Sequence, residues 1–205
     1  ELPEWAAGAA TIVWVVAMMN SLNFLDNMDG LCGGVSIIIA LSYFLCLLPR
    51  GYMGDTFVCV LLMSFVGSVA GFLYHNLSPA RIFMGDTGSG VLGLVAGGFS
   101  LWGVRDGIFP FWTALLVFSP FTVDASVTLL RRLFRGERVW RAHKSHYYQR
   151  LVQSGWGHRK TVLYEYALML ACGLSALFAQ HLKPQGQVAL VLFWCLVYPL
   201  LMAGV

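Results

Sequence analysis

The chain alternates between long apolar runs and short polar loops. Seven apolar segments stand out, at residues 5–22, 35–48, 56–73, 91–104, 108–130, 162–182 and 188–202. Most approach the roughly 20 residues that an α-helix needs to cross a bilayer. The second and fourth are shorter but rich in Gly and Ser, which are common where membrane helices pack closely, so we expect them to span as well. The pattern predicts an all-α, polytopic membrane helical bundle with about seven transmembrane helices, forming a single integral membrane domain over residues 1–205.

Composition supports this class. Hydrophobic residues make up 58% of the chain and charged residues only 11%, whereas a soluble domain is about 25% charged. The net charge of +3 comes from one basic stretch, so it reports membrane topology and gives no reason to expect a nucleic-acid partner.

That basic stretch covers residues 131–160. It holds nine of the thirteen Lys and Arg residues: Arg131, Arg132, Arg135, Arg138, Arg141, Lys144, Arg150, Arg159 and Lys160. Basic loops remain in the cytoplasm, so this loop is expected to face inward. Strict alternation of the spans then puts residues 23–34 and 74–90 inside as well. The short connections fall outside, at residues 50–55, 103–107 and 183–187.

Alternation therefore gathers the polar clusters at one membrane face. The residues concerned are Asp26, Asp29, Asp86, His143 and His146. Nothing in the composition alone requires this arrangement. It predicts a single cytoplasmic site built from three loops.

The first inner loop concentrates carboxylates and amides between two spans. It contains the pattern Asn20-x-x-Asn23-x-x-Asp26-x-x-Asp29-Gly30. Ionisable groups near a bilayer are costly unless they face water or a partner, so they are candidate functional groups. The simpler alternative is a helix cap followed by a glycine turn, which explains one Asp well but two Asp and two Asn poorly.

The second inner loop places glycines, a carboxylate and hydroxyls just before an apolar span. It includes Asn76 and ends in Phe83-Met-Gly-Asp86-Thr-Gly-Ser. Backbone N–H groups and the positive end of a helix dipole suit an anion such as phosphate. Asp86 is a candidate ligand for Mg²⁺, a hard cation that takes oxygen ligands and bridges phosphates. The alternative is that Asp86 only caps the helix.

The third inner loop combines cations with aromatic residues. His143 and His146 are three residues apart, and Arg150 follows. A zinc site has little support, because no Cys or third ligand is near. A cluster of Arg, Lys and His fits a polyphosphate better. A positive-inside loop with incidental His is the alternative, and it accounts for the Arg content fully but for the His and aromatic content only in part.

Together the three loops offer carboxylates for a metal, glycines for close approach of phosphate, and cations for phosphate charge. These are the parts of a phosphoryl-transfer site, where catalysis consists mainly of positioning and charge stabilisation.

Three sequence blocks resemble the polyprenyl-phosphate N-acetylhexosamine-1-phosphate transferases, the membrane enzymes of glycosyltransferase family 4. The Asn/Asp block at residues 20–30 and the block Phe83-Met-Gly-Asp86-Thr-Gly-Ser carry the resemblance most specifically. The third block is His146-x-x-x-Arg150 followed by residues 155–162. Order, spacing and intervening spans all agree, and the resemblance covers essentially the whole chain.

The resemblance implies transfer of a HexNAc-1-phosphate from a UDP-sugar to undecaprenyl phosphate, with release of UMP. The enzyme would be multi-pass in the bacterial inner membrane, with its active site facing the cytoplasm; a homodimer stays open. Asp86 would bind Mg²⁺, with Mn²⁺ as the alternative, while Asp26 and Asn23 would lie at the reacting phosphates. The resemblance also assigns the uridine pocket to Asp29, Asn76 and Phe83. It assigns contacts with the phosphates of the nucleotide sugar to His146 and Arg150.

Two departures from the family pattern are visible. The usual His-x-His-His block is replaced by His146 followed by Tyr147, Tyr148 and Gln149, with His143 upstream. This arrangement is more similar to enzymes that initiate O-antigen or capsule chains, so His143 is expected near the donor sugar. The family's Asp-Asp block and about four further spans are also absent. We therefore interpret the chain as a C-terminal portion that is inactive alone.

Two other classes of function compete with the transferase. A secondary transporter also uses carboxylates near broken helices, but it needs polar groups near the midplane and access from both sides. Here the outer loops are short, and only Asp124 and Glu165 fall within the spans, both near the inner end. A structural membrane anchor does not explain the Gly/Asp blocks. The sequence does not identify the donor sugar or distinguish direct from covalent transfer.

Overall fold

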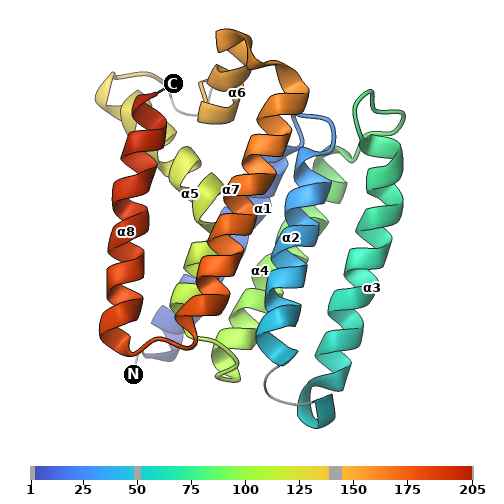
Figure 1. The fold of residues 1–205 in the computed structure, drawn as a ribbon, viewed down its shortest axis with the longest axis vertical. Coiled ribbons are helices and arrows are strands. Elements are labelled where there is room, and N and C mark those ends of the chain that lie inside the picture. The colour runs from blue at the N-terminus through green and yellow to red at the C-terminus, as the bar shows by residue number, and fades with distance from the viewer. Residues whose placement is uncertain (1–2, 49–51, 139–144, 205) are drawn as a thin grey trace.

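The computed structural model describes residues 3–48, 52–138 and 145–204, and all regular structure in these ranges is helical. Its elements, in order, are α1 (Glu4–Leu25), α2 (Leu31–Leu47), α3 (Tyr52–Asn76), α4 (Gly85–Arg105), α5 (Phe111–Phe134), α6 (Tyr147–Leu151), the π-helical turn η2 (Val152–Trp156), α7 (Gly157–Ala179) and α8 (Pro184–Ala203). Figure 1 shows the long helices as one antiparallel bundle. The prediction of an all-α membrane bundle is confirmed.

In the described residues, six helical segments are long and apolar enough to cross a membrane. One of these segments consists of α7 together with α6 and η2, which precede it. The exception among the long apolar helices is α2, which has 17 residues and is therefore about 25 Å long at 1.5 Å per residue. Most side chains of α2 are buried, because the helix lies inside the bundle between α3, α4 and α7. Protein rather than lipid surrounds it, which explains how a shorter helix is accommodated.

The third inner segment is not a simple loop. Helix α5 continues to Phe134, the short helix α6 and the turn η2 follow, and α7 already begins at Gly157. Similarly, α4 begins at Gly85 instead of at residue 91. The helix ends predicted from the apolar pattern differ from those in the structure, because Arg, Gly, Ser and Asp lower the apolar character of a helix end without ending the helix.

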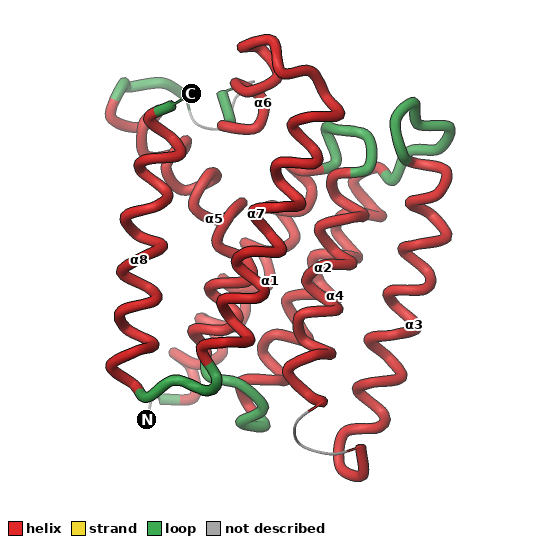
Figure 2. The backbone as a smooth tube through the Cα atoms, in the orientation of Figure 1, coloured by secondary structure: helices red, strands yellow, loops and turns green. Residues whose placement is uncertain are grey.

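The end of the bundle that the sequence predicts to face inward, called the inner end below, gathers the polar segments. In Figure 2 the loop between α1 and α2, the loop between α3 and α4, and α6 all lie at the same end. The connections between α4 and α5 and between α7 and α8 lie at the opposite end. The alternation predicted from the apolar pattern is therefore confirmed for the described residues.

Close packing of α1 against α4 sets the geometry of this inner end. A Cβ added at Gly93 of α4 would lie 2.8 Å from the Met18 carbonyl oxygen of α1 and would overlap the Met19 backbone. Only glycine permits so close an approach of two helix backbones. Helices α1 and α4 run antiparallel. One helical turn from the contact of Met19 with Gly93, Asn23 of α1 therefore lies opposite Ser89 of α4.

Candidate functional site

The centre of the site is where α1 ends and α4 begins. Asn23 donates a hydrogen bond from Nδ2 to Oδ1 of Asp86 at 2.9 Å and is also within 3.1 Å of Ser89 Oγ. Asp86 lies in the first turn of α4 and is exposed. The structure thus brings together two residues that the sequence separates by 63 positions.

A second carboxylate, Asp26, caps the C-terminus of α1 beside Asp86. Burial raises the pKa of Asp26 above its ordinary value, and the charge of Asp86 raises this pKa further, although a hydrogen bond from the Gly85 backbone opposes both effects. Two carboxylates that repel each other in a partly buried position favour a cation between them.

The donor set fits a magnesium ion. Asp26 and Asp86 offer carboxylate oxygens, and Asn23 adjoins them with its amide. In the described parts of the chain, no group of three or more His, Cys, Asp or Glu side chains is arranged to hold a metal. Two neighbouring carboxylates suit Mg²⁺, which keeps several waters and binds through one or two carboxylates together with substrate phosphates.

The first two inner loops are joined directly. Asn76, which is buried, accepts a hydrogen bond from the Gly30 backbone at 3.0 Å and donates one to the Ile82 carbonyl at 2.9 Å. Asp29 accepts a hydrogen bond from the Ala80 backbone at 3.1 Å. The structure therefore places two of the three predicted pocket residues, Asp29 and Asn76, at this junction, where each also fixes the loop conformation.

Beyond this junction lies a cavity of 270 Å³. Its lining includes Asp29 and Ser78 on one side and Arg159 and Tyr166 of α7 on the other. Arg159 donates to the Ser78 carbonyl at 3.2 Å, so α7 is attached to the second loop. Phe83, in the same loop, is 77% exposed, which leaves its ring accessible for stacking.

His146 belongs to the third inner segment. It is buried at the start of α6, and its ring centroid lies 5.3 Å from that of Phe24 in α1. Arg150 points elsewhere, with its guanidinium 5.1 Å from the centre of the Tyr147 ring. Arg150 also lines a polar cavity of 400 Å³ with Arg131, Arg132 and Arg135. The other predicted residue of this segment, His143, lies outside the described residues.

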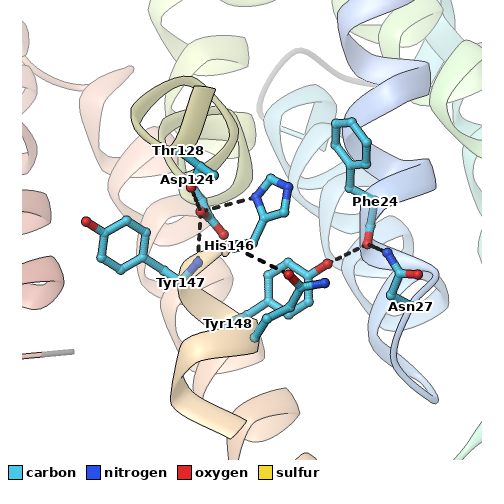
Figure 3. Close-up of polar contacts among 8 residues, drawn as sticks. Phe24, Asn27, Asp124, Thr128, His146, Tyr147 and Tyr148 are labelled. Carbon is cyan, nitrogen blue, oxygen red and sulfur yellow. Dashed lines mark hydrogen bonds and ion pairs between the residues drawn. The ribbon is translucent and has the colours of Figure 1, made fainter. Parts of the chain in front are cut away.

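A buried carboxylate holds α6 in place, and the sequence assigned it no role. Asp124 of α5 accepts hydrogen bonds at Oδ1 from Thr128 Oγ1 and from the Tyr147 backbone N–H, both at 3.0 Å. The same oxygen is 3.4 Å from Nδ1 of His146 (Figure 3). Its position near the inner end of an apolar span was the only signal in the sequence.

An apolar groove of 680 Å³ runs along the bundle to this point. Helices α1, α4 and α5 line it, with Thr11 and Phe111 among its residues toward the outer end and Asn20, Phe24 and His146 toward the inner end. Its walls are mainly apolar over the length of α1. The groove therefore links the hydrocarbon depth of the membrane with the polar inner end.

Comparison with known proteins identifies the family of the chain. Residues 1–104 match the family described as glycosyl transferase family 4. The chain is 32% identical over 84% of its length to the probable undecaprenyl-phosphate N-acetylglucosaminyl 1-phosphate transferase of Bacillus subtilis, covering 48% of that protein. It is 32% identical over 89% of its length to a decaprenyl-phosphate N-acetylglucosaminephosphotransferase of Mycolicibacterium smegmatis, covering 49%.

A further relative is the phospho-N-acetylmuramoyl-pentapeptide-transferase of Moorella thermoacetica, 30% identical over 85% of this chain and 52% of the relative. The chain thus spans about half the length of the curated relatives it matches. The family match includes the blocks that contain Asn23, Asp26 and Asp86. The resemblance seen in the sequence is confirmed, and the chain belongs to glycosyl transferase family 4.

Proposed function

We propose that the protein transfers a HexNAc-1-phosphate from a UDP-sugar to undecaprenyl phosphate and releases UMP. The reaction forms a new phosphoanhydride bond between the lipid phosphate and the sugar phosphate and breaks the one within the UDP-sugar. The relatives carry names for reactions of this class with polyprenyl acceptors. Membership of a transferase family favours this enzyme over a secondary transporter.

One observation carries the proposal: the contact of Asn23 with Asp86 at the junction of α1 and α4. It joins the two sequence blocks that are most specific for the family and puts Asp26 beside them. A phosphoryl-transfer site needs such a cluster of oxygen ligands where the charge of a diphosphate accumulates.

In this proposal each predicted residue has one task. Asp86, with Asp26 nearby, would hold Mg²⁺, which neutralises diphosphate charge when bound. Asn23 holds the Asp86 carboxylate in orientation through the hydrogen bond described above. His146 contributes positive charge or a hydrogen bond to the donor phosphates, from the start of α6.

The nucleoside would lie at the junction of the first two inner loops. Phe83 stacks on the uracil ring, as its exposure allows. Asp29 and Asn76 keep the two loops together around the nucleoside. Arg150 and His143 stay assigned to the donor phosphates and the sugar by the resemblance alone; in this structure the Arg150 guanidinium lies against the Tyr147 ring.

The apolar groove supplies a path for the acceptor. A polyprenyl chain is a long hydrocarbon, and the groove lined by α1, α4 and α5 is apolar and reaches His146. A chain bound there would leave its phosphate at the polar inner end. The site faces the cytoplasm of a bacterial inner membrane in this proposal, because UDP-sugars are cytoplasmic and the basic segment is at the same end.

The product would begin a lipid-linked envelope polysaccharide such as O-antigen or capsule. The support is the replacement of the usual His-x-His-His block by His146-Tyr-Tyr-Gln. If the enzyme is a homodimer, the proposal refers to a dimer of the complete gene product.

The experiment uses membranes that contain the complete gene product. They are supplied with undecaprenyl phosphate, Mg²⁺ and, in turn, each of several UDP-HexNAc donors, and UMP release is measured. We expect UMP release with at least one donor that depends on both the lipid phosphate and Mg²⁺. Absence of lipid-dependent UMP release from every donor, with the protein shown to be present and folded, would contradict the proposal.

A further inference from the structure

We propose that Asp124 is the positioning residue for His146: it selects the imidazole tautomer and fixes the start of α6 relative to α1. The inference deepens the proposed function and rests on it for its catalytic meaning. Its structural basis is independent of the family blocks, because Asp124 belongs to none of them.

The first observation concerns the contacts of one carboxylate oxygen of Asp124. Oδ1 of Asp124 accepts from the Thr128 hydroxyl and from the Tyr147 backbone, and it faces Nδ1 of His146 at 3.4 Å. Asp124 is 8% exposed and His146 is 6% exposed. A buried carboxylate without donors would be strongly unfavourable, so these contacts determine where the carboxylate lies.

The second observation is the direction of the imidazole. An ionised carboxylate only accepts hydrogen bonds, so a hydrogen on Nδ1 is favoured where this nitrogen faces Oδ1 of Asp124. We infer that His146 carries a hydrogen on Nδ1 and acts on the donor through Nε2. A carboxylate that orients a histidine in this way sets both the tautomer and the ring direction.

The third observation is how the ring is held on its other sides. The ring of Tyr148 stacks nearly parallel on that of His146, with centroids 5.8 Å apart. Tyr148 also donates from its hydroxyl to the Phe24 carbonyl at 2.7 Å, which ties α6 to the last turn of α1 (Figure 3). Phe24 packs against His146 as well. Because Asn23 is the neighbour of Phe24 in α1, the tie relates His146 to the carboxylate centre.

These contacts give Tyr148 and Asp124 a role at the point where the family pattern is lost. In the usual His-x-His-His pattern the two histidines that follow His146 are replaced here by Tyr148 and Gln149. Tyr147, at the variable position, supplies a backbone donor to Asp124, and Tyr148 supplies the ring and hydroxyl that hold His146 and Phe24. The substituted residue Tyr148 therefore supports the histidine.

The kinetic test is a double-mutant cycle in the complete gene product. Asp124→Asn keeps the size of the side chain and an accepting oxygen but removes the charge. We expect kcat to fall about 10–100-fold, as for other carboxylates that orient a histidine, while the KM for the UDP-sugar changes less than about threefold. In a His146→Gln background the same change should cost less than about twofold, because the histidine through which Asp124 acts is gone.

The control is Asp106→Asn at the outer end of α4, where the carboxylate accepts from Trp102 Nε1. It should leave kcat unchanged. Equal losses from Asp124→Asn in both backgrounds would overturn the inference, since a merely structural carboxylate would act without His146. A wild-type protein that releases no UMP from any donor would instead contradict the proposed function.

The tautomer can be measured without turnover or a folded Asp124 variant. Nitrogen NMR of ¹⁵N-histidine-labelled wild-type protein, with His146→Gln used for assignment, should show His146 protonated at Nδ1. Thr128→Val, which retains the carboxylate and removes one of its donors, should preserve this tautomer. A neutral His146 protonated at Nε2 in the wild-type protein would overturn the inference whatever the activity.

Discussion

The two ends of the bundle are built differently. At the outer end, the described side-chain hydrogen bonds of the connections join near neighbours, such as Trp102 to Asp106, four residues apart, and Gln187 to Ala179, eight residues apart. At the inner end, hydrogen bonds also join residues far apart in the chain, such as Gly30 to Asn76, 46 positions apart, and Tyr148 to Phe24, 124 positions apart.

This difference distinguishes connections that only join two helices from segments that are held together across the chain. A connection that only joins two helices needs hydrogen bonds within its own turn, and the two outer connections that the structure describes in full, α4–α5 and α7–α8, have these. Fixing segments from different parts of the chain costs conformational entropy, which is compensated only where their relative position matters. The inner end is therefore where sequence changes should alter chemistry, and the outer end is where matched changes should not.

The largest contrast is expected between Asp86→Asn and Asp106→Asn. Asp86→Asn removes a proposed ligand of Mg²⁺, and we expect turnover of the complete enzyme to fall roughly 10³-fold or more. Asp106→Asn, at the other end of the same helix, should stay within about twofold of wild type. UMP release at limiting Mg²⁺ measures both. A near wild-type rate for Asp86→Asn would show that the metal is held elsewhere.

The next effect is expected at the histidines. His146→Ala should lower kcat about 10²-fold, more than it raises KM, if His146 acts mainly on the transition state. His143→Ala should cost less or change the preference between donors. The measurement compares two UDP-HexNAc donors that differ at the 6-position. An inactive His143→Ala beside an active His146→Ala would place the functional histidine three residues upstream.

A smaller effect is expected from the exposed ring in the second loop. Stacking of a base on an aromatic side chain is worth roughly 1–3 kcal/mol, so Phe83→Ala should raise the KM for the UDP-sugar about tenfold, and Phe83→Tyr should be mild. Phe57→Ala is the matched control, since Phe57 is 66% exposed and lies near the outer end against Trp102. An unchanged KM in Phe83→Ala would place the uridine elsewhere.

The smallest effect on chemistry is expected from helix packing. Gly93→Ala forces apart α1 and α4 at their contact and should cost about 1–3 kcal/mol of unfolding free energy. The melting temperature should fall by roughly 2–4 °C for each kcal/mol. Gly98→Ala is the control in the same helix, because an added Cβ there meets no atom within 4 Å. Equal melting temperatures would mean that the α1–α4 approach is not tight.

Much of the fold followed from the apolar pattern, and the gathering of Asp26, Asp29, Asp86 and His146 at one end followed from alternation alone. The direct contact of Asn23 with Asp86 did not, because it depends on the close approach at Gly93. The sequence gives no measure of which faces of two spans meet.

The role of Asp124 was harder still to predict. It lies within an apolar span, and its partners are a hydroxyl in its own helix and a backbone N–H of α6. A helix of five residues is too short to show periodicity, so α6 was interpreted as loop. A backbone donor leaves no signature in the residue types, which is why Tyr147 gave no indication of this contact.

The orientation of the bundle can be tested through the accessibility of its two ends in intact cells. Ser145→Cys labels the start of the α6 region and Lys183→Cys labels the connection before α8, both in a Cys195→Ser background because Cys195 is exposed. With a membrane-impermeant thiol reagent, we predict labelling at position 183 in intact cells and at position 145 only after permeabilisation. Labelling of position 145 from outside would place the polar inner end away from the cytoplasmic UDP-sugars and would contradict the account.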